Sequence, residues 1–167
     1  AGRDQSPSGE EIDRRIEAAI RYVDENVVRH VERHPETRFY LFFPPYFRAT
    51  YAIWHQARPI HSAIHVAVIR HLAQQADRLP NLQVFGFEGE AFLDDIANYK
   101  DLGHYLDRID SQILQSMKAG RNRLSGANVE RYIEDSLQRA RSFDLAALGE
   151  RLRECGVTRQ QGPTTIR

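Results

Sequence analysis

Asp101 and His104 are the residues of this sequence whose types and spacing could perform catalysis. A carboxylate that accepts a hydrogen bond from one ring nitrogen of a histidine fixes the tautomer of the ring and leaves the other nitrogen free as a base. A spacing of three positions lets a single turn of chain bring the two side chains together. Such a base needs a nucleophile to activate, and this sequence does not supply an obvious one.

A structural explanation exists for the same pair. The segment that follows, residues 106–117, has apolar residues at helical spacing and predicts a helix. Asp101 could therefore cap free backbone N–H groups near the start of this helix, with His104 as an ordinary residue of its first turn. From the spacing alone, a catalytic and a capping role both stay open.

The composition is typical of one folded domain without a strong charge. The chain has 167 residues, of which 41% are hydrophobic and 28% charged, and we predict one α/β domain at residues 1–158 with a flexible tail at 159–167. The 23 basic and 23 acidic residues balance, which argues against nucleic-acid binding. We expect no membrane-spanning segment because no apolar run reaches about 18 residues. The single Cys155 excludes an intrachain disulfide.

Helical and extended patterns alternate along the chain. Residues 38–43 form a continuous apolar run that ends at Pro44 and Pro45, the pattern of a strand buried on both faces. A second strand is predicted at residues 82–87. Predicted helices, several with clear start or stop signals, cover residues 9–33, 50–56, 60–77, 106–117, 129–137 and 145–152. The alternation predicts an α/β fold with a parallel sheet.

Two strands are few for such a sheet. The outer edge of each strand would lack a hydrogen-bonding neighbour over its whole length. We therefore expect this chain to be the C-terminal part of a larger domain, with the first strands on an upstream segment or a partner chain. A complete, helix-rich domain with two strands is the alternative.

Two segments carry a family resemblance. Residues 39–46 read Phe-Tyr-Leu-Phe-Phe-Pro-Pro-Tyr, and residues 98–105 read Asn-Tyr-Lys-Asp-Leu-Gly-His-Tyr. In this order they resemble the C-terminal half of the SGNH, or GDSL-type, hydrolases, and in particular a poorly characterised bacterial branch of that superfamily. The resemblance covers most of residues 12–145. It implies a flavodoxin-like three-layer α/β/α fold, with His104 as the base and Asp101 as its orienting partner.

The resemblance also implies a function. Proteins of this superfamily are serine esterases or O-acyltransferases that need no cofactor, and esters of cell-surface carbohydrate are among the substrates implied. An extracytoplasmic or membrane-anchored location of the intact protein is implied in the same way. The alternative is a non-catalytic domain of the same ancestry with a structural or interaction role.

The serine motif of the superfamily is absent from this sequence. SGNH hydrolases place the serine in a Gly-Asp-Ser-like motif just after the first strand, whereas Ser8 here fits a helix cap. The other candidates fall in a polar segment, on predicted helices or at helix ends: Ser6, Ser62, Ser111, Ser116, Ser125, Ser136 and Ser142. We therefore expect the serine on an upstream segment and predict that this chain alone is inactive.

Further residues are candidates for the walls of the cleft. Ligands of open α/β sheets bind beyond the carboxyl ends of the strands, where the segment after Pro45 and the Asp101 segment should meet. We predict that Tyr46, Arg48 and Tyr105 contact the substrate, whereas core packing is the better interpretation of Trp54.

A metal site is a weaker hypothesis. His61 and His65 are four positions apart on a predicted helix, a spacing that can place both rings on one ion. The segment between them lacks the glutamate of the His-Glu-x-x-His motif, and the sequence indicates no third ligand. We interpret both as ordinary helix histidines and predict no metal.

Overall fold

The computed structural model describes residues 7–101 and 103–154. The helices are α1 (Gly9–Val23), α2 (Arg29–Arg33), α3 (Arg48–Ala57), α4 (Pro59–Arg78), α5 (Asp107–Lys118), α6 (Val129–Ser142) and α7 (Leu145–Glu154). The strands are β1 (Phe39–Phe42), β2 (Leu82–Phe85) and β3 (Arg123–Leu124). Two short 3₁₀ helices, η2 (Ala91–Asp94) and η3 (Ile96–Asn98), precede the segment that carries Asp101 and His104. The tail predicted at residues 159–167 lies outside the described residues.

The first helical segment follows its sequence signals closely. The hydroxyl of Ser8 accepts a hydrogen bond from the backbone N–H of Glu11 at 3.2 Å, which is the predicted N-terminal cap. A π-helical turn, η1 (Asp24–Val28), joins α1 to α2. Helical geometry ends at Arg33, as expected from Pro35 two residues later.

The sheet is mixed and small. Its strand order is β1-β2-β3. β1 and β2 are parallel, with Phe39 opposite Leu82 and Phe42 opposite Phe85, and this pair confirms the predicted parallel arrangement. β3 is antiparallel to β2. We did not predict β3 because a strand of two residues has no detectable period.

The prediction that residues 38–43 form a strand buried on both faces is wrong for β1. Tyr40 is 46% exposed and Phe42 is 38% exposed. β1 lies at the edge of the sheet, and no strand of the described residues pairs with its outer side. On the same face, α5 packs against Phe85, the last residue of β2, and against Phe87 just after it, while Tyr40 and Phe42 of β1 stay partly exposed.

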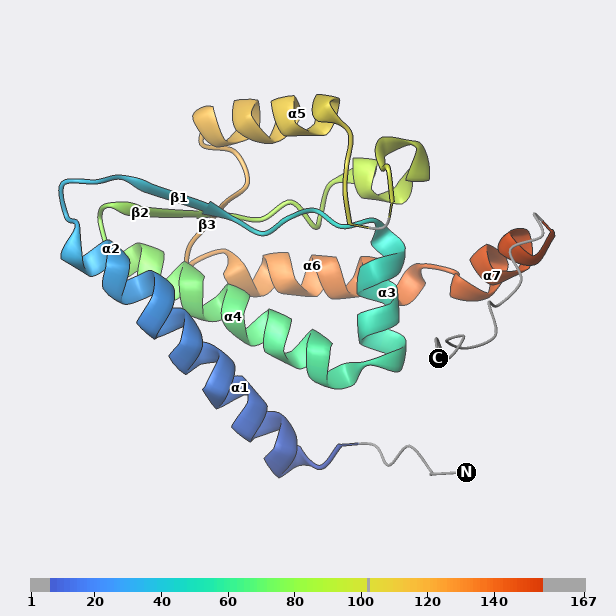
Figure 1. Ribbon diagram of the computed structural model, residues 1–167, viewed down its shortest axis with the longest axis horizontal. Helices are drawn as coiled ribbons and strands as arrows, with labels where there is room; N and C mark the ends of the chain where they lie inside the picture. Colours follow the sequence, from blue (N-terminus) through green and yellow to red (C-terminus); the bar gives the residue numbers. More distant parts are fainter. Residues whose placement is uncertain (1–6, 102, 155–167) are drawn as a thin grey trace, which may run out of the picture.

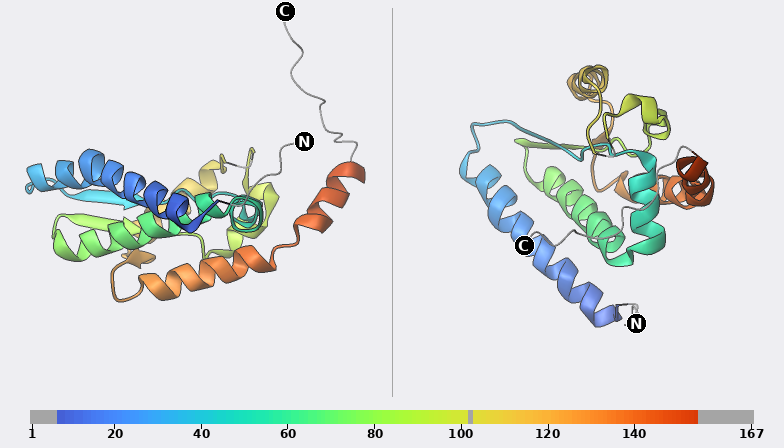
Figure 2. Two further views of the ribbon diagram at one scale, coloured as in Figure 1. Left: turned by 90° about the horizontal axis from the view of Figure 1, so that it is seen from below. Right: turned by 45° about the vertical axis from the view of Figure 1, so that its right-hand side comes forward.

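Helices cover the two faces of the sheet unequally. Figure 1 shows α5 on one face and α1, α4 and α6 on the other, and Figure 2 shows α1 lying alongside α4. The main core lies between β2 and the larger helical layer; its members include Val31, Ile69, Leu72, Ala73, Leu82, Val84, Leu124 and Val129. No helix of the described residues is long and apolar enough to cross a membrane.

Candidate functional site

Asp101 and His104 lie on a tight hairpin between η3 and α5. Tyr99 and Tyr105 form an antiparallel bridge at its base. The backbone N–H of Lys100 donates to the carbonyl of His104 at 2.7 Å, and the N–H of Leu106 donates to the carbonyl of Asn98 at 2.8 Å. These bonds fix the loop that carries the two candidate catalytic side chains.

The Asp101 carboxylate holds the His104 ring directly. Nδ1 of His104 lies 2.7 Å from Oδ2 and 2.9 Å from Oδ1 of Asp101. Because an ionised carboxylate can only accept, Nδ1 must carry the proton of this bond, and Nε2 of a neutral ring then has a free lone pair. The sequence-based pairing of these residues is therefore present in the structure.

The same carboxylate is oriented by the backbone. Oδ1 of Asp101 accepts the N–H groups of Gly103 and of His104, each at 2.8 Å. The N–H of Gly103, followed by the ring of His104, lowers the pKa of the Asp101 carboxyl below its usual value. The capping role anticipated from the sequence is thus also present, within the hairpin and not at the start of α5, whose N-cap residue is Leu106. Catalytic orientation and local capping do not exclude each other.

The pair opens onto a shallow surface depression. Its lining combines the loop that follows β1 with the hairpin and the start of α5: Pro44, Tyr46, Lys100, Asp101, Gly103, His104, Tyr105 and Asp110. The side chains of Asp101 and His104 are 60% and 79% exposed. No serine, threonine or cysteine of the described residues lines this depression.

The predicted wall residues have different positions. Tyr46 and Tyr105 line the depression beside His104, and burial, followed by the charge of Asp110, raises the pKa of the Tyr105 hydroxyl. Trp54 packs edge-to-face on Tyr46 and Tyr51, in agreement with its interpretation as a packing residue.

Arg48 does not line the depression. Its side chain is 1% exposed, and it donates to the backbone carbonyls of Glu88 and Glu90 and to the carboxylate of Asp94, 2.7 Å away. Arg48 therefore does not take the predicted wall position, because the first residue of α3 faces the turn after β2 and its guanidinium binds the carbonyls of that turn. Arg48 stabilises that turn, and none of these hydrogen bonds is directed at the depression.

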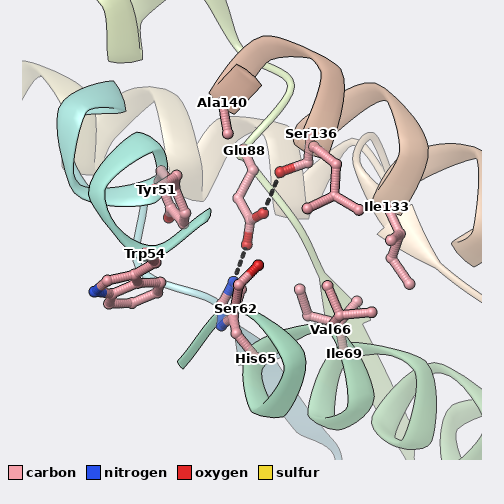
Figure 3. Close-up of a pocket in the computed structure, with 11 residues that line it drawn as sticks. Tyr51, Trp54, Ser62, His65, Val66, Ile69, Glu88, Ile133, Ser136 and Ala140 are labelled. Atoms are coloured by element: carbon pink, nitrogen blue, oxygen red, sulfur yellow. Dashed lines mark hydrogen bonds and ion pairs between the residues drawn. The ribbon is translucent and has the colours of Figure 1, made fainter. Parts of the chain in front are cut away.

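A second cluster of polar side chains, which the sequence patterns did not predict, lies inside the molecule (Figure 3). The carboxylate of Glu88, only 2% exposed, accepts the hydroxyl of Ser136 at 2.5 Å and lies 2.5 Å from Nε2 of His65. Burial of Glu88 is unusual for a charged residue. In the sequence, Glu88 could have been recognised by its position three residues after the end of the buried strand β2.

The order of contacts argues against catalysis at Glu88. The carboxylate separates the hydroxyl of Ser136 from the ring of His65, so the histidine cannot accept the serine proton in this arrangement. The adjoining cavity measures about 20 Å³, which is room for about one water molecule. We conclude that these three residues tie α4 and α6 to the turn after β2.

The described residues do not place a set of metal ligands around His61 and His65. His65 binds Glu88, and His61 is exposed on α4. Within residues 7–101 and 103–154, no three histidine, cysteine, aspartate or glutamate side chains are placed to hold one ion.

Comparisons with known proteins give no relative for this chain. No protein-family model, no curated protein and no solved structure matches it. The functional argument therefore depends on the residues and their geometry.

Proposed function

We propose that Asp101 and His104 are the acid–base pair of an SGNH-like serine esterase or O-acyltransferase. The observation that carries the proposal is the bond between Nδ1 of His104 and the Asp101 carboxylate, 2.7 Å long, at the edge of an open depression. This bond leaves Nε2 available as a base. The family resemblance of residues 39–46 and 98–105 supports the same assignment.

The reaction is acyl transfer through a covalent ester. The serine oxygen attacks the carbonyl carbon of the substrate as His104 Nε2 takes the serine proton, and the imidazolium then protonates the leaving oxygen. Water or a sugar hydroxyl, deprotonated by the same nitrogen, then attacks the ester, and the imidazolium returns the proton to the serine oxygen as the acyl group is released. Asp101 holds the ring in the required tautomer and stabilises its positive charge.

The open shape of the site favours a large substrate. The depression is flanked by the rings of Tyr46 and Tyr105 and by the carboxylate of Asp110. Aromatic rings beside hydrogen-bonding carboxylates suit the apolar faces and hydroxyl groups of sugars. An ester on a cell-surface carbohydrate is the substrate class that we propose.

The serine is proposed to come from another segment, which also completes the sheet. Phe39 donates its N–H to the carbonyl of Asn81, just before β2, at 2.8 Å, and Phe43 donates to the carbonyl of Phe85 in β2 at 3.1 Å. The alternating residues Tyr40 and Phe42 therefore direct their backbone groups to the outer edge. A parallel strand added at this edge would end on the same side as Pro44, next to the depression. The parallel strands completed in this way would have the flavodoxin-like arrangement implied by the resemblance, with the antiparallel β3 added at the opposite edge.

The test uses the full-length gene product and an activated acetyl ester. Replacement of His104 by alanine is expected to lower kcat by about 10² to 10⁴, the usual contribution of a general base, and to slow labelling of the serine by a fluorophosphonate. His61→Ala, on an exposed histidine of α4, serves as the control. Unchanged turnover and labelling in His104→Ala would refute the proposal.

A non-catalytic role has one specific observation in its favour. Oδ1 of Asp101 accepts two backbone N–H groups, so the pair would stabilise the hairpin even without a reaction. This alternative predicts that the wild-type full-length protein is neither labelled by the fluorophosphonate nor active on the ester. Labelling that depends on His104 would exclude it.

A further inference from the structure

The loop that forms one wall of the depression has an unusual shortage of hydrogen-bond donors. Pro44 and Pro45 have no backbone N–H, so Tyr46 supplies the first donor of the loop. That N–H donates to the carbonyl of Pro44 at 3.0 Å, whereas the carbonyl of the buried Pro45 needs a donor from another segment. Two tyrosine hydroxyls, one from α3 and one from the Asp101 hairpin, donate to the carbonyls of Pro44 and Pro45, and we name these contacts the tyrosine clamp.

Tyr51 supplies the first half of the clamp. Its hydroxyl donates to the carbonyl of Pro44 at 3.0 Å and accepts the N–H of Tyr46 at 3.2 Å. Tyr51 is 4% exposed and its ring packs against Trp54. Its hydroxyl therefore bridges the two ends of the loop.

Tyr99 supplies the second half. Its hydroxyl donates to the carbonyl of Pro45 at 2.9 Å, and Tyr99 is also one side of the bridge that closes the hairpin of Asp101 and His104. One tyrosine thus joins the loop after β1 to the segment that carries Asp101 and His104, the proposed catalytic dyad.

The protonation of both tyrosines suits this role. Burial, followed by the negative charge of Glu88, raises the pKa of the Tyr51 hydroxyl well above its ordinary value. Burial also raises the pKa of Tyr99. Both hydroxyl groups therefore stay protonated and can donate hydrogen bonds to the proline carbonyls, which a phenolate could not do.

The clamped loop lies close to the segment of Asp101 and His104. The ring of Tyr46 lies close to Gly103, so that a Cβ added to Gly103 would be 3.9 Å from Cε1 of Tyr46 and 3.6 Å from Oδ1 of Asp101. The wall and the carboxylate thus lie side by side at this glycine. A shift of the loop would therefore change the space beside Asp101.

We infer that Tyr51 and Tyr99 are positioning residues, which set the separation between the loop of residues 44–46 and the hairpin of Asp101 and His104. The inference extends the proposed function of this site and rests on it for its kinetic consequences. Its structural part can be measured without any substrate.

The structural test compares Tyr51→Phe and Tyr99→Phe with Tyr132→Phe. Tyr132 is a matched control because its hydroxyl also binds a backbone N–H, that of Glu88 at 3.1 Å, but has no bond to residues 44–46. In full-length protein labelled at its histidines, the ring resonances of His104, assigned with His104→Ala, are expected to shift in both clamp variants and to stay in place in Tyr132→Phe. Unshifted His104 resonances in both clamp variants would overturn the inference.

The kinetic test uses the same variants with the activated acetyl ester. Tyr51→Phe releases the wall and is expected to raise KM about tenfold, whereas Tyr99→Phe releases the dyad hairpin and is expected to lower kcat about tenfold. Equal losses in all three variants, in proportion to their melting temperatures, would indicate a merely structural role and overturn the inference. If His104→Ala is as active as wild type, the proposed function fails. The shifts of the His104 resonances then decide by themselves whether Tyr51 and Tyr99 position the hairpin.

Discussion

The carboxylate of Asp101 binds His104 at two points: Oδ2 lies 2.7 Å from ring nitrogen Nδ1, and Oδ1 accepts the backbone N–H at 2.8 Å. The second bond fixes the carboxylate relative to the main chain, so the first can fix the ring. Both depend on the three-residue spacing and on the hairpin closed by Tyr99 and Tyr105.

Asp101→Asn is expected to impair the dyad without unfolding the protein. The amide can present its N–H to Nδ1, which then takes the lone pair, so the proton moves to Nε2 and the base is lost. We expect kcat on the activated ester to fall by about 10² to 10⁴ in the full-length protein. Asp95→Asn is the control, because the Asp95 carboxylate also accepts a backbone N–H, that of Ala97, but has no bond to a histidine. Histidine ¹⁵N shifts that show unprotonated Nε2 in Asp101→Asn would contradict this reasoning.

Protonation of Asp101 should destabilise the hairpin only in strongly acidic solution. Its folded-state pKa is lowered, first by the N–H of Gly103 and then by His104. The stabilisation is therefore fully present above the unfolded value of about 3.9 and is lost as the pH falls through the lower folded value. The carboxyl ¹³C titration of Asp101 should have its midpoint below 3.9, and His104→Ala should raise it only in part, because the larger cause remains. Gly103→Ala, which keeps the N–H, should leave it in place; a midpoint at or above 3.9 in wild type would disprove the assignment.

Gly86→Ala is expected to destabilise the fold. A Cβ at Gly86 would lie 2.4 Å from Cζ of Tyr132, so the ring and its hydroxyl bond to the N–H of Glu88 must shift. We expect a loss of about 1–3 kcal/mol in the free energy of unfolding, the range for overpacking, measured by urea denaturation. Gly89→Ala is the control, since nothing lies within 4 Å of its added Cβ. Equal stability of the two variants would show that the Tyr132 ring is free to move.

Arg48→Met should cost far more stability than loss of an exposed arginine. The buried guanidinium bonds to the carbonyls of Glu88 and Glu90, and these acceptors would be left without their donor. We expect a loss of about 3 kcal/mol in the free energy of unfolding. Arg15→Met, which removes an exposed pair with Glu11, should change it by less than about 0.5 kcal/mol. If Arg48 instead contacts substrate, Arg48→Met would change KM at nearly unchanged stability.

Local signals predicted most elements because they act over a few residues. Ser8, the apolar spacing along α4 and Gly120 each mark a helix through neighbours in the chain. The φ of 68° at Gly120 in the structure is the left-handed conformation that favours glycine after a helix. β3 and the exposed face of β1 were not predictable in this way, because they depend on which distant segments pair or pack with them.

The sequence by itself determined the Asp101–His104 pair, the parallel order of β1 and β2, and the meeting of the Pro44 loop with the hairpin at the carboxyl ends of the strands. Only the tertiary structure decided that Arg48 is buried, that Glu88 lies between Ser136 and His65, and that Tyr51 and Tyr99 hold the proline carbonyls. The physical reason is the range of the interactions. A three-residue turn brings Asp101 and His104 together locally, whereas a buried donor or acceptor takes its partner from whichever distant segment the packing of the core places beside it.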